Sequence, residues 1–191
     1  MGATATGKTK LSVALARALK GEVISADSRQ VYRGMDIGSG KDLGSYEEGG
    51  RPVRYHIIDV AEAGEEYNLF RFKEDFQWAL GDLDTRGVLP ILCGGTGLYL
   101  DAVLRRYRIQ EAPKLPELRE RLEELSQEEL LSELESMKVL HNKTDSEDRE
   151  RMIRAIEIAK AKDTELREED FFPKVSYRAF CLQLPRELLR E

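Results

Sequence analysis

Residues 2–9 constrain the fold of this chain more than any other stretch of its sequence. They read GATATGKT and fit the pattern G-x-x-x-x-G-K-[ST]. In such a loop the glycines let successive backbone N–H groups surround a phosphate, and the helix that follows presents the positive end of its dipole. Lys8 is expected to reach the phosphate oxygens, and the Thr9 hydroxyl is expected to bind Mg²⁺. The predicted diphosphate-binding residues are therefore Gly2, Ala3, Thr4, Ala5, Thr6, Gly7, Lys8 and Thr9.

The loop alone leaves the ligand open, because kinases, ATPases and diphosphate-using transferases all carry one. Two other interpretations compete with it. The stretch Met1–Thr6 fits an N-myristoylation pattern, which would need Gly2 as a free terminus, and a glycine-containing helix start needs no ligand at all. We favour the phosphate-binding loop because an amphipathic helix follows at residues 11–19, with Gly21 as its predicted left-handed end.

Alternating strands and helices define the predicted fold class. Asn68 is expected to cap one of the helices and Gly87 to close it. Each predicted strand is a continuous apolar run, which is typical of a parallel sheet buried on both faces. We therefore predict an α/β fold, a P-loop NTPase-like parallel sheet with helices on both faces. The predicted strands are residues 23–26, 55–60, 88–93 and 178–184.

The amino-acid composition of the sequence changes after Arg108. Residues 116–139 are rich in Glu, Leu and Arg, and Ser126 with Glu129 forms a capping box. A further helix is expected near residues 146–161, before the strand that returns to the sheet. The predicted organisation is a catalytic core at 1–109, a small helical insertion at 110–145 and a return to the core at 146–191.

Composition excludes several classes of protein. No stretch approaches the roughly 18 consecutive apolar residues of a membrane span. The two cysteines, Cys93 and Cys181, cannot make a disulfide framework or a Cys-rich metal site, so we expect a cytoplasmic protein without membrane contact. The net charge of −6 argues weakly against nucleic acid as a partner.

Polar groups follow the predicted strands at their carboxyl ends, where open α/β sheets bind ligands. Asp27 follows the first of these strands, Asp59 lies near the end of the second, and the turn Gly94–Gly97 follows the third. A carboxylate at this edge suits a general base or a partner of Mg²⁺. Helix capping, a surface charge or a tight connecting turn would explain the same residues equally well.

Five segments resemble one family in their order and spacing. They read GATATGKT, ISADSRQVYRGMDIGSGK, YHIIDV, PILCGGTGLYL and RMIRAIEI. The family is that of the tRNA dimethylallyltransferases, also called tRNA isopentenyltransferases. The resemblance covers about residues 1–158, and SADSRQVYRGMDIG is its most specific part, since generic phosphate-loop kinases do not carry it.

The resemblance implies an enzyme that uses dimethylallyl diphosphate with Mg²⁺ rather than ATP. Such an enzyme moves the dimethylallyl group to N6 of adenosine 37, beside the anticodon of certain tRNAs, and releases diphosphate. By motif position, Asp27 resembles the base that accepts the N6 proton, and Thr96 the hydroxyl that holds the bridging diphosphate oxygen. Lys8 and Thr9 would stabilise the charge that grows on the diphosphate. The adenine would leave its stack to enter the pocket.

The resemblance also implies contacts with the anticodon loop of tRNA. Two positions depart from the family pattern: Glu150 stands where Gln is usual, and GSGK at Gly38–Lys41 replaces the common GTAK. Residues 101–191 hold 18 basic and 22 acidic side chains, so recognition would depend on a few placed arginines rather than on bulk charge. The predicted tRNA-binding residues are Asp27, Ser28, Arg29, Gln30, Thr96, Arg119, Glu150, Arg151, Met152, Ile153 and Arg154.

Family members extend beyond both ends of this sequence. The resemblance therefore implies that a strand before Gly2 and helices after residue 191 are missing, and we expect little or no activity of the chain as written. We expect a monomer. Two other functions stay open, an adenylate isopentenyltransferase acting on free AMP, ADP or ATP and a non-catalytic phosphate-loop remnant. The insertion and the R-x-x-R-A-I-E segment favour tRNA as the acceptor.

Overall fold

The computed structural model of the chain describes residues 1–2, 6–109, 115–137, 148–161 and 168–183. Its contacts divide the chain into two units. Unit 1 comprises residues 1–109 and 171–191, and unit 2 comprises residues 110–170. The elements of unit 1 are α1 (Lys8–Leu19), β1 (Glu22–Ser25), α2 (Gly44–Glu47), β2 (Tyr55–His56), α3 (Leu69–Thr85), β3 (Pro90–Cys93) and α4 (Gly97–Leu104).

The sheet of unit 1 is parallel and has the strand order β2-β1-β3. Val23 of β1 pairs with Tyr55 of β2 and with Ile91 of β3, so β1 is the central strand of the described sheet. All four residues of β1 are buried. This is the pattern expected of a strand that is covered on both sides, because helices pack on both faces of such sheets.

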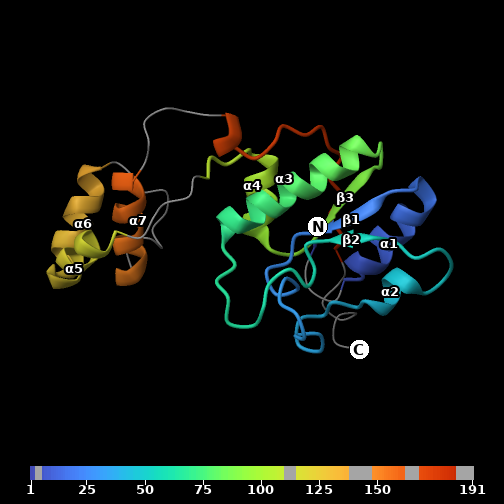
Figure 1. Cartoon of the computed structure of the whole chain (residues 1–191), viewed down its shortest axis with the longest axis horizontal. Coiled ribbons are helices and arrows are strands. Elements are labelled where there is room, and N and C mark those ends of the chain that lie inside the picture. Colours follow the sequence, from blue (N-terminus) through green and yellow to red (C-terminus); the bar gives the residue numbers. More distant parts are fainter. Residues whose placement is uncertain (3–5, 110–114, 138–147, 162–167, 184–191) are drawn as a thin grey trace. The chain divides into compact units, whose positions relative to one another are not determined.

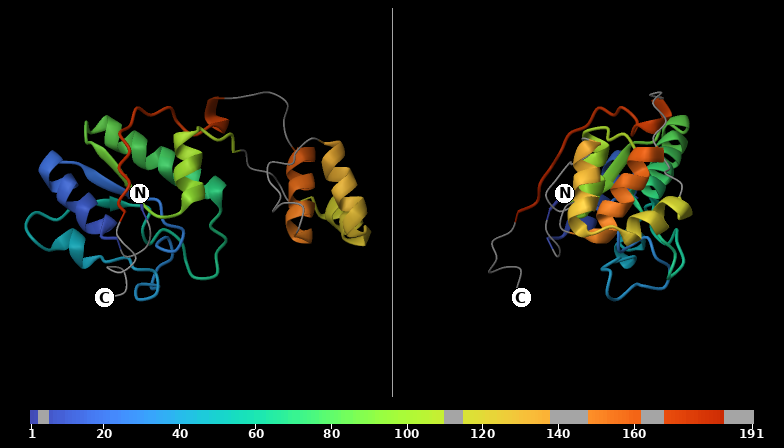
Figure 2. Two further views of the ribbon diagram at one scale, coloured as in Figure 1. Left: turned by 180° about the vertical axis from the view of Figure 1, so that it is seen from behind. Right: turned by 90° about the vertical axis from the view of Figure 1, so that its left-hand side faces the viewer.

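Helices cover both faces of the sheet, as the sequence predicts. Val23 packs in one core with Val13 and Ala16 of α1, while its neighbour Ile24 packs in a second core with Phe72 of α3. Successive side chains of a strand point to opposite faces, so these two cores lie on opposite sides of β1. Figure 1 and the left view of Figure 2 show α1 and α2 on one side of the strands and α3 and α4 on the other.

Stacked aromatic rings fix α4 against α3. The rings of Phe72 and Tyr99 stack with centroids 4.0 Å apart, and Phe172 lies 6.0 Å from Phe72. All three side chains are buried. Since buried aromatic side chains dominate core energetics, this cluster holds the start of α4 in place.

Three predicted strands differ in extent from the structure, and the run 88–93 is a strand only at Pro90–Cys93. The run 55–60 is a strand only at Tyr55–His56, because Ile57 and Asp59 have φ angles of 62° and 57° and leave the extended conformation. The run 178–184 forms no strand in its described part. It makes a single parallel bridge, between Gly2 and Leu182, so the prediction of a strand in this described part was wrong, and the prediction for 55–60 was wrong in extent.

The predicted residue caps the start of α3, whereas the left-handed residue that ends α1 is not the predicted one. Asn68 caps α3, its side chain accepting a hydrogen bond from the Arg71 backbone N–H at 3.0 Å, as predicted. The left-handed residue after α1 is Lys20 (φ 55°) and not Gly21. Gly21 is needed for another reason, because a Cβ there would lie 2.5 Å from the Leu89 carbonyl oxygen.

Unit 2 has its own apolar core. Leu122, Leu130 and Leu134 pack there with Met152 and Ile156, all fully buried. The predicted capping box is present, with both reciprocal hydrogen bonds between Ser126 and Glu129. The helix of residues 149–161 packs in this core, whereas the predicted organisation has residues 146–191 returning to the first unit. The elements are α5 (Pro116–Glu124), α6 (Gln127–Ser136), α7 (Arg149–Ala161) and the 3-10 helix η2 (Glu168–Asp170).

Among the described residues, the longest helix is α3, and none combines the length and apolarity that a membrane crossing needs.

Candidate active site

The phosphate-binding motif forms the entry to α1. Gly7 has a φ of 78°, a left-handed conformation that suits glycine, and the helix starts at the next residue, Lys8. Lys8 and Thr9 therefore lie in the first turn, where the free N–H groups of the helix favour an anion. Thr6 is buried just before them. The predicted ligands Ala3, Thr4 and Ala5 lie outside the described residues.

The turn between β3 and α4 lies beside this loop. A Cβ placed on Gly95 would lie 3.8 Å from the Nζ of Lys8 and 3.7 Å from the carbonyl oxygen of Gly2. Gly94 lies so close to β1 that a Cβ there would be 2.1 Å from the Ala26 carbonyl oxygen. Only glycine fits that contact, so the Gly-Gly pair lets the turn come close to both the sheet and Lys8.

Thr96 is fixed by the segment that follows β1. Its hydroxyl accepts a hydrogen bond from the Ser28 backbone N–H at 2.9 Å and donates to the Ser28 hydroxyl at 3.2 Å. Its own N–H donates to the Ala26 carbonyl oxygen at 3.2 Å. The side chain is therefore oriented in advance, while its proton is held by a long bond that a stronger acceptor could replace.

Asp27 lies beside Thr96, at the same carboxyl edge of the sheet. One carboxylate oxygen accepts from the Arg29 N–H at 3.0 Å, and within the described part of the chain the other oxygen makes no hydrogen bond. The pKa of the nearby Tyr99 is shifted in this environment. Burial, with smaller effects of Tyr32 and Asp27, raises the pKa of Tyr99 to about 12. Asp27 thus has one fixed oxygen and one that is available to a proton donor.

A hollow opens next to these groups. Its volume is about 510 Å³, and it is lined by Ser28, Arg29, Tyr32 and the loop 34–39. The Arg29 side chain is exposed, whereas the Gln30 side chain is buried. Gln30 accepts from the Ser25 hydroxyl and donates to the Gly40 carbonyl oxygen, which ties the loop to β1. Gln30 was predicted to contact tRNA, but its amide is engaged inside the protein.

Lys41 holds the other end of this loop, a role that no motif in the sequence predicts. Its side chain is 1% exposed, and its ammonium donates to the Tyr32 carbonyl oxygen, to Asp36 and to Asp59. Burial acts to lower the pKa of Lys41, but the hydrogen bonds to Asp36 and Asp59 outweigh it and the net shift is upward. Asp59, a candidate base or Mg²⁺ partner, is thereby committed to Lys41.

Clusters of His, Cys, Asp or Glu side chains are what usually hold a metal ion in a protein. Within the described residues no three His, Cys, Asp or Glu side chains form a cluster suited to a metal. Mg²⁺ bound beside phosphates commonly uses only one or two protein oxygens together with phosphate oxygens, so a cluster of this kind is not required for it. Thr9, in the first turn of α1, remains the predicted Mg²⁺ ligand.

In unit 2, the predicted tRNA contacts divide into charged and buried groups. Arg119 lies 3.4 Å from Glu150 and 3.5 Å from Glu157, and Arg154 lies 3.2 Å from Glu157. Glu157 is fully buried, so this carboxylate orients both arginines. No local sequence pattern marks Glu157 for this role, because its pairing with Arg119 joins residues far apart in the chain.

The remaining predicted contacts differ in exposure. Arg151 is exposed, whereas the side chains of Met152 and Ile153 lie in the core of unit 2. Only backbone groups of those two residues would be within reach of a ligand.

The fold and the carboxyl-edge geometry define a class. A GxxxxGKT loop opens α1, a parallel sheet follows, and polar groups gather where its strands end. This is a P-loop α/β protein, a class in which the loop before the first helix characteristically binds phosphate groups. Comparison with known families narrows the class. The family model "IPP transferase" matches residues 30–191, and the model "Isopentenyl transferase" matches residues 1–58. The chain belongs to the IPP transferase family.

Individual relatives agree with this assignment. The chain is 47% identical over its whole length to tRNA dimethylallyltransferase 1 of Parabacteroides distasonis, of which it covers 62%. It is 53% identical to tRNA dimethylallyltransferase 2 of Citrifermentans bemidjiense, covering 60% of that protein. The chain thus spans about three fifths of the length of these relatives.

Solved structures of similar proteins agree with this family assignment. The structure of the full-length tRNA isopentenylpyrophosphate transferase of Bacillus halodurans matches 84% of this chain and 54% of its own, with a TM-score of 0.53 and 36% identity. A eukaryotic dimethylallyltransferase acting on tRNA matches 82% of this chain and 39% of its own, with a TM-score of 0.66 and 28% identity. The predicted α/β fold of the P-loop type is confirmed.

Proposed function

We propose that this chain carries the catalytic site of an enzyme that transfers a dimethylallyl group from dimethylallyl diphosphate to N6 of adenosine 37 in tRNA. The observation that carries the proposal is the hydrogen bonding between Thr96 and Ser28, which brings Asp27 and Thr96 together at the carboxyl edge of the sheet. The turn that bears Thr96 also lies beside Lys8. A leaving group and an acceptor could therefore meet there.

Each of these residues would have one role in the proposed reaction. The bond between C1 of the dimethylallyl group and the bridging diphosphate oxygen breaks, and a bond from C1 to N6 forms. The N6 proton passes to the available carboxylate oxygen of Asp27. The Thr96 hydroxyl donates to the bridging oxygen in place of Ser28, and Lys8 with the first turn of α1 binds the departing diphosphate. Bound beside Thr9, Mg²⁺ would neutralise part of the diphosphate charge.

The acceptor would approach from the 510 Å³ hollow. Its exposed Arg29 and the ring of Tyr32 offer a guanidinium plane and an aromatic face, which suit an unstacked base and its phosphates. We include Arg119, Arg151 and Arg154 of unit 2 among the tRNA contacts, with Glu157 as the residue that orients two of them. The enzyme is proposed to act as a monomer in the cytoplasm.

The test offers labelled dimethylallyl diphosphate to the 191-residue chain with either tRNA or AMP. We expect label on tRNA, at a low rate. Asp27→Asn should reduce the rate by about 100-fold or more, and Thr96→Ala by a similar factor, because each removes one group that acts on the reacting atoms. Asp84→Asn, a change of the same type on an exposed carboxylate of α3, should have no effect.

Each other result points to a different function. Label on AMP alone would favour an adenylate isopentenyltransferase. Binding of dimethylallyl diphosphate without transfer to either acceptor would indicate a non-catalytic remnant. Full activity of Asp27→Asn would remove Asp27 from its role as the base.

A further inference from the structure

A second hollow lies at the opposite edge of the sheet from Asp27 and Thr96. Its volume is about 310 Å³. Glu22, which begins β1, lines it together with Arg54, which precedes β2, and Val88, which precedes β3. The strands are parallel, so their amino ends meet at one edge, and this hollow is separated from the candidate active site by the length of the strands.

Basic side chains dominate the lining of this hollow. Five come from three separate segments, against the single carboxylate of Glu22. They are Arg17, Lys20, Arg51, Arg54 and Arg86. Apolar side chains, among them Val53 and Val88, form the rest of the wall. A concave, partly apolar surface that is mainly basic focuses the electric field and attracts anions.

Two of the five basic side chains already have partners. Arg86 donates to both carboxylate oxygens of Glu22, at 2.7 and 2.8 Å, and to Asp82. Arg17 donates to backbone carbonyl oxygens of the segment 45–51, including that of Arg51 at 3.2 Å. Arg17 thereby fixes the backbone from which Arg51 projects.

The other three side chains have no such partners. Lys20, Arg51 and Arg54 are exposed, and in the part of the chain that the structure describes their side chains make no ion pair or hydrogen bond. Lys20 ends α1, where a cation offsets the negative end of the helix dipole, so its position has a local explanation. Arg51 and Arg54 belong to the segment before β2 and have no comparable role.

We propose that this hollow binds a small, multiply charged phosphate anion. Guanidinium groups bind phosphate oxygens in a two-pronged geometry, and two unpaired guanidinium groups on one wall suit such a ligand. The volume lies at the lower end of the range of small-molecule pockets, about 300–1,000 Å³, which fits a compact anion and not a polymer. The site is separate from the phosphate loop and needs no residue of the proposed reaction.

The test is a titration of the ¹⁵N-labelled 191-residue chain with inorganic pyrophosphate, followed by NMR. Two groups of amide signals are compared, those of Gly7–Thr9 at the phosphate loop and those of Gly21, Arg54 and Val88 at the hollow. We expect both groups to shift, each with its own affinity. Arg54→Gln should weaken binding at the hollow by about tenfold or more, since it removes charge-assisted hydrogen bonds, and should leave the phosphate-loop signals unchanged.

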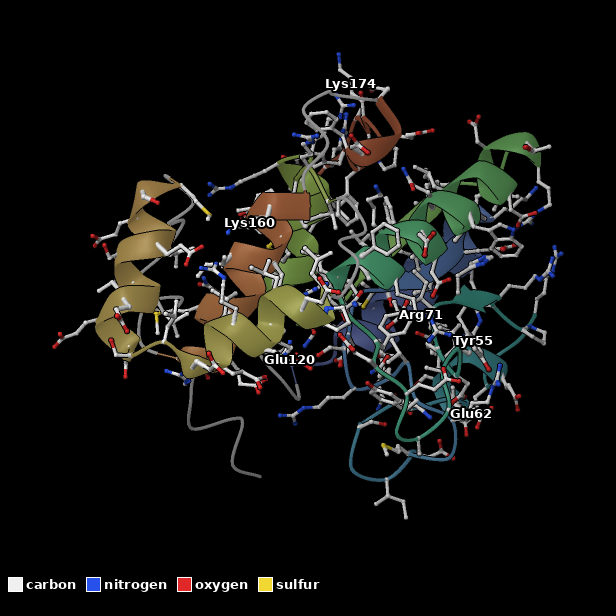
Figure 3. The ribbon with its side chains drawn as sticks, turned by 60° about the vertical axis from the view of Figure 1, so that its left-hand side comes forward. Tyr55, Glu62, Arg71, Glu120, Lys160 and Lys174 are labelled. Atoms are coloured by element: carbon white, nitrogen blue, oxygen red, sulfur yellow. The ribbon has the colours of Figure 1, made fainter. Side chains whose placement is uncertain are left out.

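Matched variants make the result decisive. Lys174→Gln removes one exposed positive charge elsewhere in unit 1 (Figure 3) and should leave both affinities unchanged. Lys8→Ala should weaken binding at the phosphate loop and spare the hollow. Shifts confined to Gly7–Thr9 would overturn the proposal. So would an equal effect of Lys174→Gln and Arg54→Gln, or a response of the hollow to duplex RNA but not to pyrophosphate.

Discussion

Replacing Glu22 by glutamine tests how much one charged group at the start of β1 stabilises unit 1. Its carboxylate accepts two hydrogen bonds from Arg86, at 2.7 and 2.8 Å, and lies 2.8 Å from the His56 Nε2. The side chain is only 10% exposed, so solvent and salt screen these interactions weakly. Glutamine keeps the shape of the side chain and removes the charge.

The magnitude follows from the pKa of Glu22. The hydrogen bond from Arg86, with a smaller contribution from His56, outweighs the effect of burial and lowers this pKa from 4.5 to about 2. A lowered pKa means that the folded chain binds fewer protons at this group than the unfolded chain between about pH 2 and pH 4.5. The charged form therefore contributes about 3 kcal/mol to the free energy of unfolding at neutral pH. This contribution decreases below pH 4.5 and is lost near pH 2.

The assay is urea unfolding at several pH values, followed by the fluorescence of Trp78, the single tryptophan of the chain, which lies in α3 of unit 1. The difference between the native chain and Glu22→Gln should be about 3 kcal/mol at pH 7 and less than half of that at pH 3. Glu62→Gln is the control (Glu62 is labelled in Figure 3). The pair of Glu62 with Arg33 is exposed and should contribute less than about 1 kcal/mol. A difference that stays constant with pH would refute the electrostatic reasoning.

Two further predictions concern the loop and unit 2. Lys41→Met should lower the free energy of unfolding of unit 1 by about 2–3 kcal/mol in urea titrations, because Asp36 and Asp59 lose their cation but keep contact with water. A loss below 1 kcal/mol would contradict this role of Lys41. Ser126→Ala removes the cap of α6 and should cost about 1 kcal/mol, seen as faster hydrogen exchange in unit 2 alone. Equal acceleration in unit 1 would show that the two units unfold together.

Local sequence patterns predicted most of the helices and the direction of the sheet. Asn68 before α3 and Ser126 with Glu129 before α6 are short-range signals, and each makes the expected hydrogen bond. The apolar run after His56 misled the prediction, since hydrophobicity does not reveal the positive φ of Ile57 that ends β2. The backbone there turns to bring Asp59 to Lys41, a tertiary contact that no local pattern encodes.

In the candidate site, too, local motifs predicted some features, whereas they did not predict contacts between distant residues. The GKT motif predicted where Lys8 and Thr9 lie, because a phosphate loop and its helix are contiguous in sequence. The contact of Thr96 with Ser28 joins two motifs 68 residues apart, and their closeness followed only from the rule that parallel strands end at one edge. Glu157 could not be identified in this way, since a glutamate on an amphipathic helix is usually exposed.

The place of β3 in the sheet affects how the chain behaves in concentrated solution. β3 pairs with β1 on one side, and no other strand of the described residues pairs with its second side. Its sequence, PILC, carries no charge, and its side chains are partly exposed. Unpaired peptide groups along an uncharged strand are a template for a strand from another molecule. Pro90, the first residue of β3, has no N–H group to donate, so the sequence of β3 itself weakens this template for association between chains.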